Sequence, residues 1–292
     1  MRKLVVLLAV VLGMLATALP AGAITGSYVE DFEHPFVGLV VFYDENGEFL
    51  HRCSGSLLTP TVFLTAGHCT DGATTARVYF QQDAGANYDP ETELDPVSGY
   101  PEYCAEGTLG TLCATSDELY NYGFNDFEGY PNTRDVGLVI LDQPIQLPEY
   151  GQLAEAGFLD ELAAASKRKA ITFTASGYGL TESNPVHVTS FRERLMAQSR
   201  LTNLTSHNTD GFNLQTNGNG GDRGGTCSGD SGGPVFYGGF ESNTIVAVTS
   251  FGMNEWCRGV DFSYRTDQQA VLDWIRDTVG EDEFAKIEIV EL

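Results

Sequence analysis

Positively charged residues are scarce in this chain. Its 292 residues include 16 lysines and arginines against 40 aspartates and glutamates, which gives a formal net charge of −24 at pH 7. So acidic a surface repels phosphate backbones, and this argues against a nucleic-acid-binding protein. The excess of carboxylates favours solubility, and attraction of basic substrates is the alternative interpretation.

Long apolar runs are also missing after the first 19 residues. Arg2 and Lys3 precede a run of 16 apolar residues, which ends at Leu19 and is followed by Pro20-Ala21-Gly22-Ala23. This pattern predicts a secretory signal peptide over residues 1–23. A retained membrane anchor is the alternative, but a bilayer span needs about 20 apolar residues. We therefore expect a secreted protein that begins at Ile24 and has no membrane contact after cleavage.

The sequence shows no internal repeat and no low-complexity linker, so the remainder forms one large domain or two fused small barrels. Short β-branched and aromatic runs alternate with glycine-rich turns, which predicts an antiparallel barrel or sandwich. Asp267–Val279 has the apolar spacing of a helix. The predicted strands include Val37–Tyr43, Val62–Thr65, Arg77–Phe80, Val136–Leu141, Ala170–Thr174, Val235–Tyr237 and Thr244–Phe251.

Six cysteines in an exported chain indicate three disulfides, for which the sequence alone allows 15 pairings. No paired C-x-x-C spacing is present, which argues against a metal site formed by these residues.

Three motifs carry the chemistry, in the chain order histidine, aspartate, serine. A serine hydroxyl becomes an effective nucleophile when an imidazole takes its proton and a buried carboxylate orients that imidazole. An aspartate at the start of an apolar run also needs a partner for its charge. The motifs are Leu64-Thr65-Ala66-Gly67-His68-Cys69, Arg134-Asp135-Val136-Gly137-Leu138 and Gly225-Thr226-Cys227-Ser228-Gly229-Asp230-Ser231-Gly232-Gly233-Pro234.

With these motifs the chain resembles the trypsin-like (chymotrypsin-fold, S1) serine proteases over roughly residues 24–276. The resemblance implies an all-β fold of two packed antiparallel six-stranded β-barrels and a C-terminal α-helix. It places the barrels at about 24–150 and 151–266 within a peptidase domain of residues 24–280. It also implies the disulfide pairs Cys53–Cys69 and Cys227–Cys257, which leaves Cys104 and Cys113 as the third pair.

By the same resemblance His68, Asp135 and Ser231 form the catalytic triad, and the amides of Gly229 and Ser231 form an oxyanion hole. An amino terminus at Ile24 would pair with Asp230 to assemble the site, without a separate zymogen stage. The alternatives are that Ile24 is simply the first residue, or that a short propeptide is removed further along.

The resemblance places the substrate pocket at Gly225, Thr226, Ser250, Phe251 and Gly252. Members that cleave after arginine or lysine carry an aspartate at the position of Gly225, so we expect a neutral pocket that prefers aromatic or large aliphatic residues.

Asp261 bears on this preference, because strand alternation decides where its side chain points. Directed inward, it would permit arginine or lysine. If Tyr264 matches the family's tyrosine in this strand, Asp261 points away from the pocket, which is the orientation that we predict.

Two segments depart from the family. Residues 81–131 are long and acidic and contain Cys104 and Cys113. We expect a solvated loop there, with Ca²⁺ binding by hard oxygen ligands or substrate gating as alternatives, although no EF-hand spacing occurs. Residues 281–292 form an acidic C-terminal extension.

The sequence thus predicts a secreted, monomeric serine endopeptidase that needs no cofactor and acts on proteins or peptides through an acyl-enzyme. One alternative is a catalytically silent binding or regulatory protein on the same fold. Others are an acyl transferase or esterase with the same triad, and a glutamyl endopeptidase.

Overall fold

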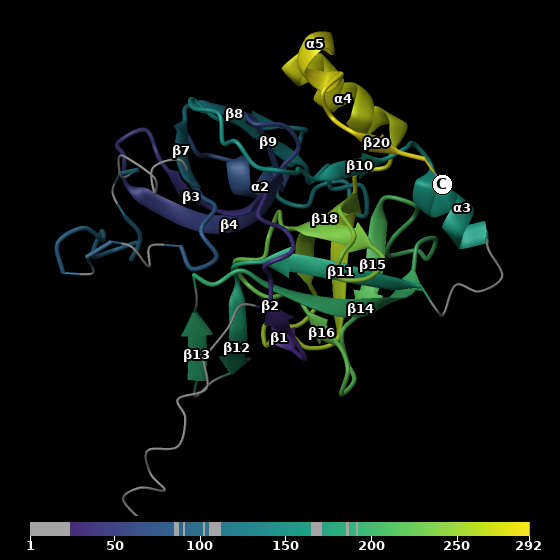
Figure 1. Ribbon diagram of the computed structural model, residues 1–292. Coiled ribbons are helices and arrows are strands. Elements are labelled where there is room, and N and C mark those ends of the chain that lie inside the picture. Colours follow the sequence, from purple (N-terminus) through teal and green to yellow (C-terminus); the bar gives the residue numbers. More distant parts are fainter. Residues whose placement is uncertain are drawn as a thin grey trace, which may run out of the picture.

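The computed structural model describes residues 24–84, 88–89, 91–101, 103–104, 112–164, 171–184, 187–190 and 192–291. The predicted signal peptide, residues 1–23, lies outside the described residues. Two β-barrels lie side by side, and a C-terminal helix lies along one side of the pair (Figure 1).

The first barrel is an antiparallel sheet in the order β7-β6-β3-β4-β5-β9-β8. Only Asp117 separates β7 from β8, so these two act as one bent strand and close a six-stranded ring. The strands are β3 (Val37–Tyr43), β4 (Phe49–Leu57), β5 (Val62–Thr65), β6 (Thr75–Tyr79), β7 (Cys113–Ser116), β8 (Glu118–Asn121) and β9 (Gly137–Ile140).

The second barrel follows the order β17-β11-β14-β15-β19-β18, and pairing of β17 with β18 closes the ring. The strands are β11 (Thr172–Gly177), β14 (Leu195–Asn203), β15 (Asn213–Asn217), β17 (Pro234–Tyr237), β18 (Thr244–Gly252) and β19 (Val260–Arg265). The predicted fold of two antiparallel six-stranded barrels with a C-terminal helix is therefore confirmed.

Shorter strands and helices flank the barrels. The strands β12 (Leu180–Asn184) and β13 (His187–Ser190) form a hairpin that projects from the second barrel (Figure 1). Helix α3 (Phe158–Ala164) covers the other end, and its Leu159 amide donates to the buried Asp267 carboxylate.

The N-terminal segment, which the expected division at residue 150 groups with the first barrel, pairs with strands of the second barrel. Strand β2 (Val29–Glu30) pairs with β14, and β1 (Thr25–Gly26) pairs with β16 (Gly224–Gly225). Ile24 is fully buried beside these pairs. The first residues of the described chain are thus fixed beside the strand that precedes the predicted nucleophile loop.

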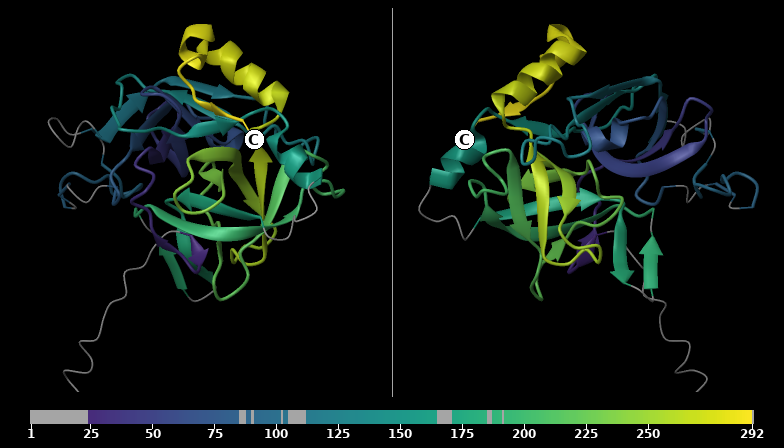
Figure 2. Two further views of the ribbon diagram at one scale, coloured as in Figure 1. Left: turned by 45° about the vertical axis from the view of Figure 1, so that its right-hand side comes forward. Right: turned by 180° about the vertical axis from the view of Figure 1, so that it is seen from behind.

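The C-terminal residues, helix α4 (Gln269–Val279) together with the extension, lie along one side of the two barrels (Figure 2). Helix α4 is followed by α5 (Glu281–Phe284), and β20 (Ile289–Val290) adds in parallel to β10 (Gln152–Ala154). Strand β10 in turn pairs in parallel with β18. Trp274 packs on Tyr122 of the first barrel with ring centroids 5.2 Å apart. These residues therefore join the first barrel to the segment that links the barrels.

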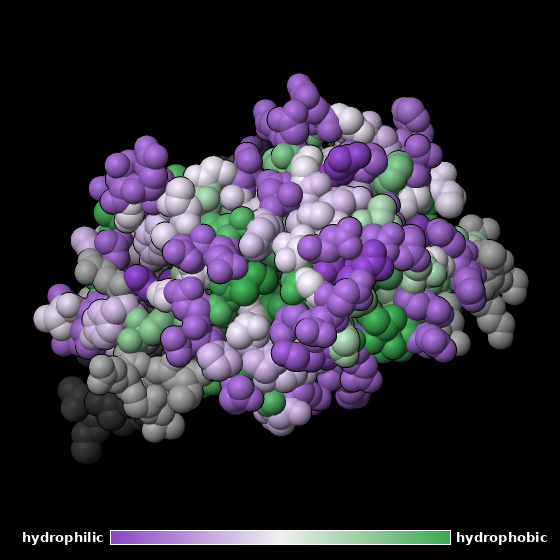
Figure 3. Space-filling model, turned by 90° about the horizontal axis from the view of Figure 1, so that it is seen from above, coloured by the Kyte–Doolittle hydropathy of each residue, from purple (hydrophilic) through white to green (hydrophobic). Residues whose placement is uncertain are grey.

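The longest helix, α4, has 11 residues, and nowhere in the described part of the chain does a helix have the length and apolarity to cross a membrane. The face seen from above is mostly hydrophilic, with its hydrophobic residues gathered toward the middle (Figure 3).

Candidate active site

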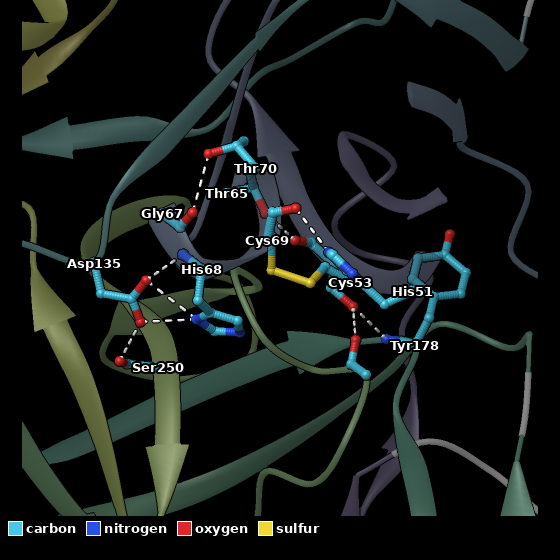
Figure 4. Close-up of a disulfide and its surroundings, with 12 residues drawn as sticks. His51, Cys53, Thr65, Gly67, His68, Cys69, Thr70, Asp135, Tyr178 and Ser250 are labelled. Atoms are coloured by element: carbon cyan, nitrogen blue, oxygen red, sulfur yellow. Dashed lines mark hydrogen bonds and ion pairs between the residues drawn. A yellow bond between two sulfur atoms is a disulfide. The ribbon is translucent and has the colours of Figure 1, made fainter. Parts of the chain in front are cut away.

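His68 and Asp135 lie in contact, although 67 positions separate them in the sequence. Helix α2 (Gly67–Thr70) carries His68 directly after β5, and Asp135 comes just before β9, which pairs with β5. The His68 Nδ1 atom lies 2.9 Å from Asp135 Oδ2, and the His68 backbone amide donates to Asp135 Oδ1 at 2.7 Å (Figure 4). Asp135 is fully buried, so this pairing fixes the imidazole ring and satisfies the buried charge.

Ser250 of the second barrel completes the surroundings of Asp135. Its hydroxyl donates to Asp135 Oδ2 in a short hydrogen bond (Figure 4). The carboxylate therefore has partners from both barrels and lies where the two barrels meet.

Ser231 lies in the turn between β16 and β17. Its carbonyl oxygen accepts a hydrogen bond from the Ser54 amide at 2.8 Å, and the next amide, that of Gly232, donates to Thr249 O at 2.7 Å. The Ser231 side chain lines a cavity of about 400 Å³ together with Ser250 and Gly252. Within the described residues no hydrogen bond joins Ser231 to His68; such bonds are often long in unbound enzymes and tighten with substrate.

The backbone around Ser231 leaves two amides free. Neither the Gly229 nor the Ser231 N–H donates to any of the described residues. Gly229 has a φ of +99°, and a Cβ atom there would lie 2.9 Å from the Gly179 Cα atom. Glycine is therefore required at this position by both conformation and space. Unpartnered amides beside Ser231, the predicted nucleophile, are what an oxyanion site needs.

Asp230 points away from Ser231 into the protein and is fully buried. Its oxygens accept hydrogen bonds from the Gly179 amide at 2.8 Å and the Cys227 amide at 2.9 Å. Burial raises the pKa of this carboxyl group to about 7. A Cβ atom on Gly177 would come within 2.4 Å of Asp230 Oδ1, which explains one glycine of the Gly177-Tyr178-Gly179 turn.

Ile24, the predicted partner of Asp230, is also fully buried and packs in an apolar cluster with Leu195 and Ala197. Its neighbour Thr25 pairs with Gly225. Among the described residues no hydrogen bond or ion pair joins Ile24 to Asp230, so the structure does not show the predicted pairing.

The predicted orientation of Asp261 is wrong. Its Oδ2 atom accepts a hydrogen bond from the Thr226 amide at 3.1 Å, and a Cβ atom on Gly225 would lie 2.6 Å from that oxygen. Alternation in β19 does separate Asp261 from Phe262, which stacks on Phe251 with centroids 4.7 Å apart. The Asp261 side chain, however, faces Gly225 and Thr226, two of the predicted pocket residues. Burial raises the pKa of this carboxyl group to about 6.

Sequence reasoning missed an aromatic row on the loop before Asp135. The Phe124 ring lies 5.8 Å from the His68 ring, and Phe127 lies 5.1 Å from Phe124 and 5.3 Å from Phe251. Phe127 is 39% exposed. These phenylalanines belong to no motif in the sequence, so they can be identified only from their contacts with His68 and Phe251 in the structure.

All six cysteines form disulfides, in the three pairs that the resemblance implies. Cys53–Cys69 holds α2 against β4 beside His68 (Figure 4), and Cys227–Cys257 joins the loop that carries Ser231 to the segment after β18. Cys104–Cys113 closes a loop of its own in the acidic segment.

The acidic segment offers no group of three ligands to a cation within the part that is described. Residues 85–87, 90, 102 and 105–111 lie outside that part. The one group of three candidate ligands among the described residues is Cys53, His68 and Cys69, whose cysteines are joined to each other. The calcium hypothesis therefore gains no support from the described carboxylates.

Comparison with protein families matches residues 24–275 to the family described as Trypsin. The chain belongs to this family of serine proteases. It is 28% identical over 268 residues to Serine protease 1 of Drosophila melanogaster, covering 89% of this chain and 86% of that protein. It is 27% identical over 235 residues to Brachyurin of Leptuca pugilator (79% and 89%) and 25% identical over 245 residues to human chymotrypsin-like elastase family member 3B (82% and 82%).

Solved structures show the same fold at low identity. HL collagenase aligns with a TM-score of 0.61 at 19% identity, over 88% of this chain and 98% of that one. Human heparin binding protein aligns with a TM-score of 0.57 at 18% identity, over 86% and 95%. Because one fold here hosts proteins named for different properties, function depends on the site.

Proposed function

We propose that this protein is a secreted serine endopeptidase that hydrolyses peptide bonds with Ser231, His68 and Asp135. The observation that carries the proposal is the His68–Asp135 pair, with Nδ1 at 2.9 Å from the carboxylate and the Ser250 hydroxyl on the same oxygen. A carboxylate on Nδ1 leaves Nε2 as the basic nitrogen, which is the tautomer that a general base requires.

Each step of the reaction has a residue to perform it. Ser231 Oγ attacks the scissile carbonyl as His68 takes its proton, and the free amides of Gly229 and Ser231 stabilise the oxyanion. His68 then protonates the leaving amine, which leaves an acyl-enzyme on Ser231. Water, deprotonated by His68, attacks the acyl-enzyme and releases the acid product.

The pocket beside Ser231 sets the residue that precedes the cut. Its lining includes Thr226, Phe251 and Gly252. The proposed base is Gly225, next to Thr226, and Asp261 lies against Gly225 and bonds to the Thr226 amide. We propose that the pocket takes large apolar residues and also arginine or lysine, with Asp261 supplying the negative charge that Gly225 lacks. This replaces the expectation of a purely neutral pocket.

Maturation follows from the N-terminal segment. We propose that removal of residues 1–23 during export frees the Ile24 amine, which then pairs with Asp230. Support comes from the burial of Ile24, from the pairing of Thr25 with Gly225 and from the high pKa of a carboxyl group buried without a cation. A buried carboxylate without a partner is costly to ionise, and an adjacent ammonium group would favour its charged form.

Cleavage-site mapping tests the proposed function. Mature wild-type protein and a Ser231→Ala variant are incubated with a diverse peptide mixture, and the products are identified by mass spectrometry. We expect cuts by the wild type alone, after large apolar residues and after arginine or lysine. Absence of Ser231-dependent cuts would contradict the proposal and favour a binding protein, whereas ester hydrolysis without peptide cuts would favour an esterase.

The alternative of a binding protein without catalytic activity also depends on charge. The net charge of −24 disfavours a polyanion such as heparin as the ligand of such a protein.

A further inference from the structure

The side chain of Ser54 connects the first barrel to the nucleophile loop of the second. Ser54 follows Cys53 in β4 and is fully buried. Its Oγ atom donates a hydrogen bond to the Gly229 carbonyl oxygen at 2.8 Å and accepts one from the Tyr178 amide at 2.9 Å. One hydroxyl therefore satisfies the buried Tyr178 amide and the half-buried Gly229 carbonyl, which belong to two separate loops.

The backbone of Ser54 is held equally firmly. Its amide donates to the Ser231 carbonyl at 2.8 Å, and its own carbonyl accepts from the Thr65 hydroxyl at 2.8 Å. Ser54 thus binds Gly229 through its side chain and Ser231 through its main chain. These are the two residues whose amides the proposed function assigns to the oxyanion.

The contact with Gly229 has a specific consequence for backbone geometry. Glycine rotates freely, and Gly229 is held at a φ of +99° in a turn whose own amide has no partner among the described residues. Fixing the Gly229 carbonyl fixes the peptide plane that follows Gly229 and restrains the rotation that aims its amide. An oxyanion donor is effective when it is preorganised at the position where charge develops.

We infer that Ser54 is a positioning residue, which holds the amides of Gly229 and Ser231 in the orientation that binds the oxyanion. The inference rests on the proposed function, because it concerns the same reaction. Without the hydroxyl, the buried Tyr178 amide loses its partner, at a cost of about 1–3 kcal/mol, and the half-buried Gly229 carbonyl loses the bond that holds it. Rotation about Gly229 relieves part of this cost and turns its amide away.

The test compares Ser54→Ala with Ser56→Ala. Ser56 lies two residues further along β4, is equally buried, and its Oγ atom has no hydrogen-bond partner among the described residues. Both variants lose one buried hydroxyl, but only Ser54→Ala loses the contact with Gly229. Steady-state kinetics on one peptide substrate and thermal unfolding are measured for each.

We expect kcat of Ser54→Ala to fall about tenfold to a hundredfold with KM changed less than about twofold, since loss of an entire oxyanion donor costs about 10²–10³ in rate. Affinity for a peptide aldehyde, which forms a tetrahedral adduct with Ser231, should fall by the same factor. Affinity for the corresponding peptide alcohol, which forms none, should not change. Ser56→Ala should match the wild type in all these measurements.

A second variant keeps the inference testable if Ser54→Ala does not fold. Thr65→Val removes the hydroxyl that holds the Ser54 carbonyl at nearly constant volume, and we expect a several-fold lower kcat with unchanged KM. Unchanged kcat in the folded variant, or equal losses in Ser56→Ala, would overturn the role of Ser54 while wild-type cleavage still supports the proposed function. No Ser231-dependent cleavage by the wild type would overturn both.

Discussion

Asp261 and Gly225 are in contact at the proposed base of the pocket: Asp261 Oδ2 occupies the space into which a side chain on Gly225 would project, 2.6 Å from where its Cβ atom would lie. Asp261 is 7% exposed, and its carboxyl group accepts a hydrogen bond from the Thr226 amide. A glycine at one position thus makes room for an acid from another strand.

The first prediction concerns the charge at this base. Asp261→Asn should lower kcat/KM for substrates with arginine before the cut about tenfold to a hundredfold, because a hydrogen bond to a charged group contributes about 1.5–3 kcal/mol. Matched substrates with phenylalanine at that position should change less than about threefold. Equal losses for both substrates would contradict this role of Asp261.

The raised pKa of Asp261 predicts a pH dependence of specificity. Burial raises the pKa of this carboxyl group to about 6, so it is neutral below that pH and charged above it. The ratio of kcat/KM for arginine substrates to that for phenylalanine substrates should therefore rise as the pH increases through about 6. Taking the ratio cancels the titration of the triad, which affects both substrates. The Asp261→Asn variant should show a flat ratio, and a flat ratio in the wild type would refute the assignment.

The position of the amino terminus is predicted to control activity. A protein that begins with one extra glycine before Ile24 should lose activity at least about a hundredfold, because disrupting a buried ion pair costs about 3–5 kcal/mol. An insertion of one glycine after Gly47 serves as control, since that turn is exposed and has no neighbour within 4 Å of its Cβ position. Full activity with the extended terminus would exclude pairing of Ile24 with Asp230.

The C-terminal extension is predicted to stabilise the fold. Ile287 is 5% exposed and Ile289 is 37% exposed, although both belong to the segment that adds β20 to β10. Ile287→Ala should lower the free energy of unfolding by about 2–4 kcal/mol through loss of packing. Ile289→Ala should lower it by less than about 1 kcal/mol. Urea unfolding measures both values, and equal effects would show that the extension does not pack as the structure has it.

Features of this protein that are encoded by adjacent residues can be predicted from the sequence, whereas features that depend on distant segments cannot. The turns around His68 and Ser231 are encoded by adjacent residues, so the motifs indicate them directly, and short β-branched runs indicate most barrel strands. Alternation along β19 correctly separates Asp261 from Phe262, but which residues Asp261 faces depends on how β19 lies against its neighbours and against Gly225 and Thr226, which its own segment does not encode.

Contacts between residues far apart in the sequence could not be predicted from the sequence for the same reason. Ser54 meets Gly229 across 175 positions, and Leu153 of β10 pairs with Ile289 of β20. No spacing within a single segment signals either contact. The acidic composition of residues 281–292 likewise gave no indication that Ile287 is buried.

The central claim is that His68 and Asp135 make Ser231 a nucleophile, and covalent labelling tests it most directly. The mature protein is treated with a fluorophosphonate, and the modified residue and the rate are read by mass spectrometry, with His68→Ala as the comparison. The account predicts rapid modification of Ser231 alone, slowed at least about a thousandfold in His68→Ala. Slow labelling spread over several residues, or equal rates in both proteins, would contradict it.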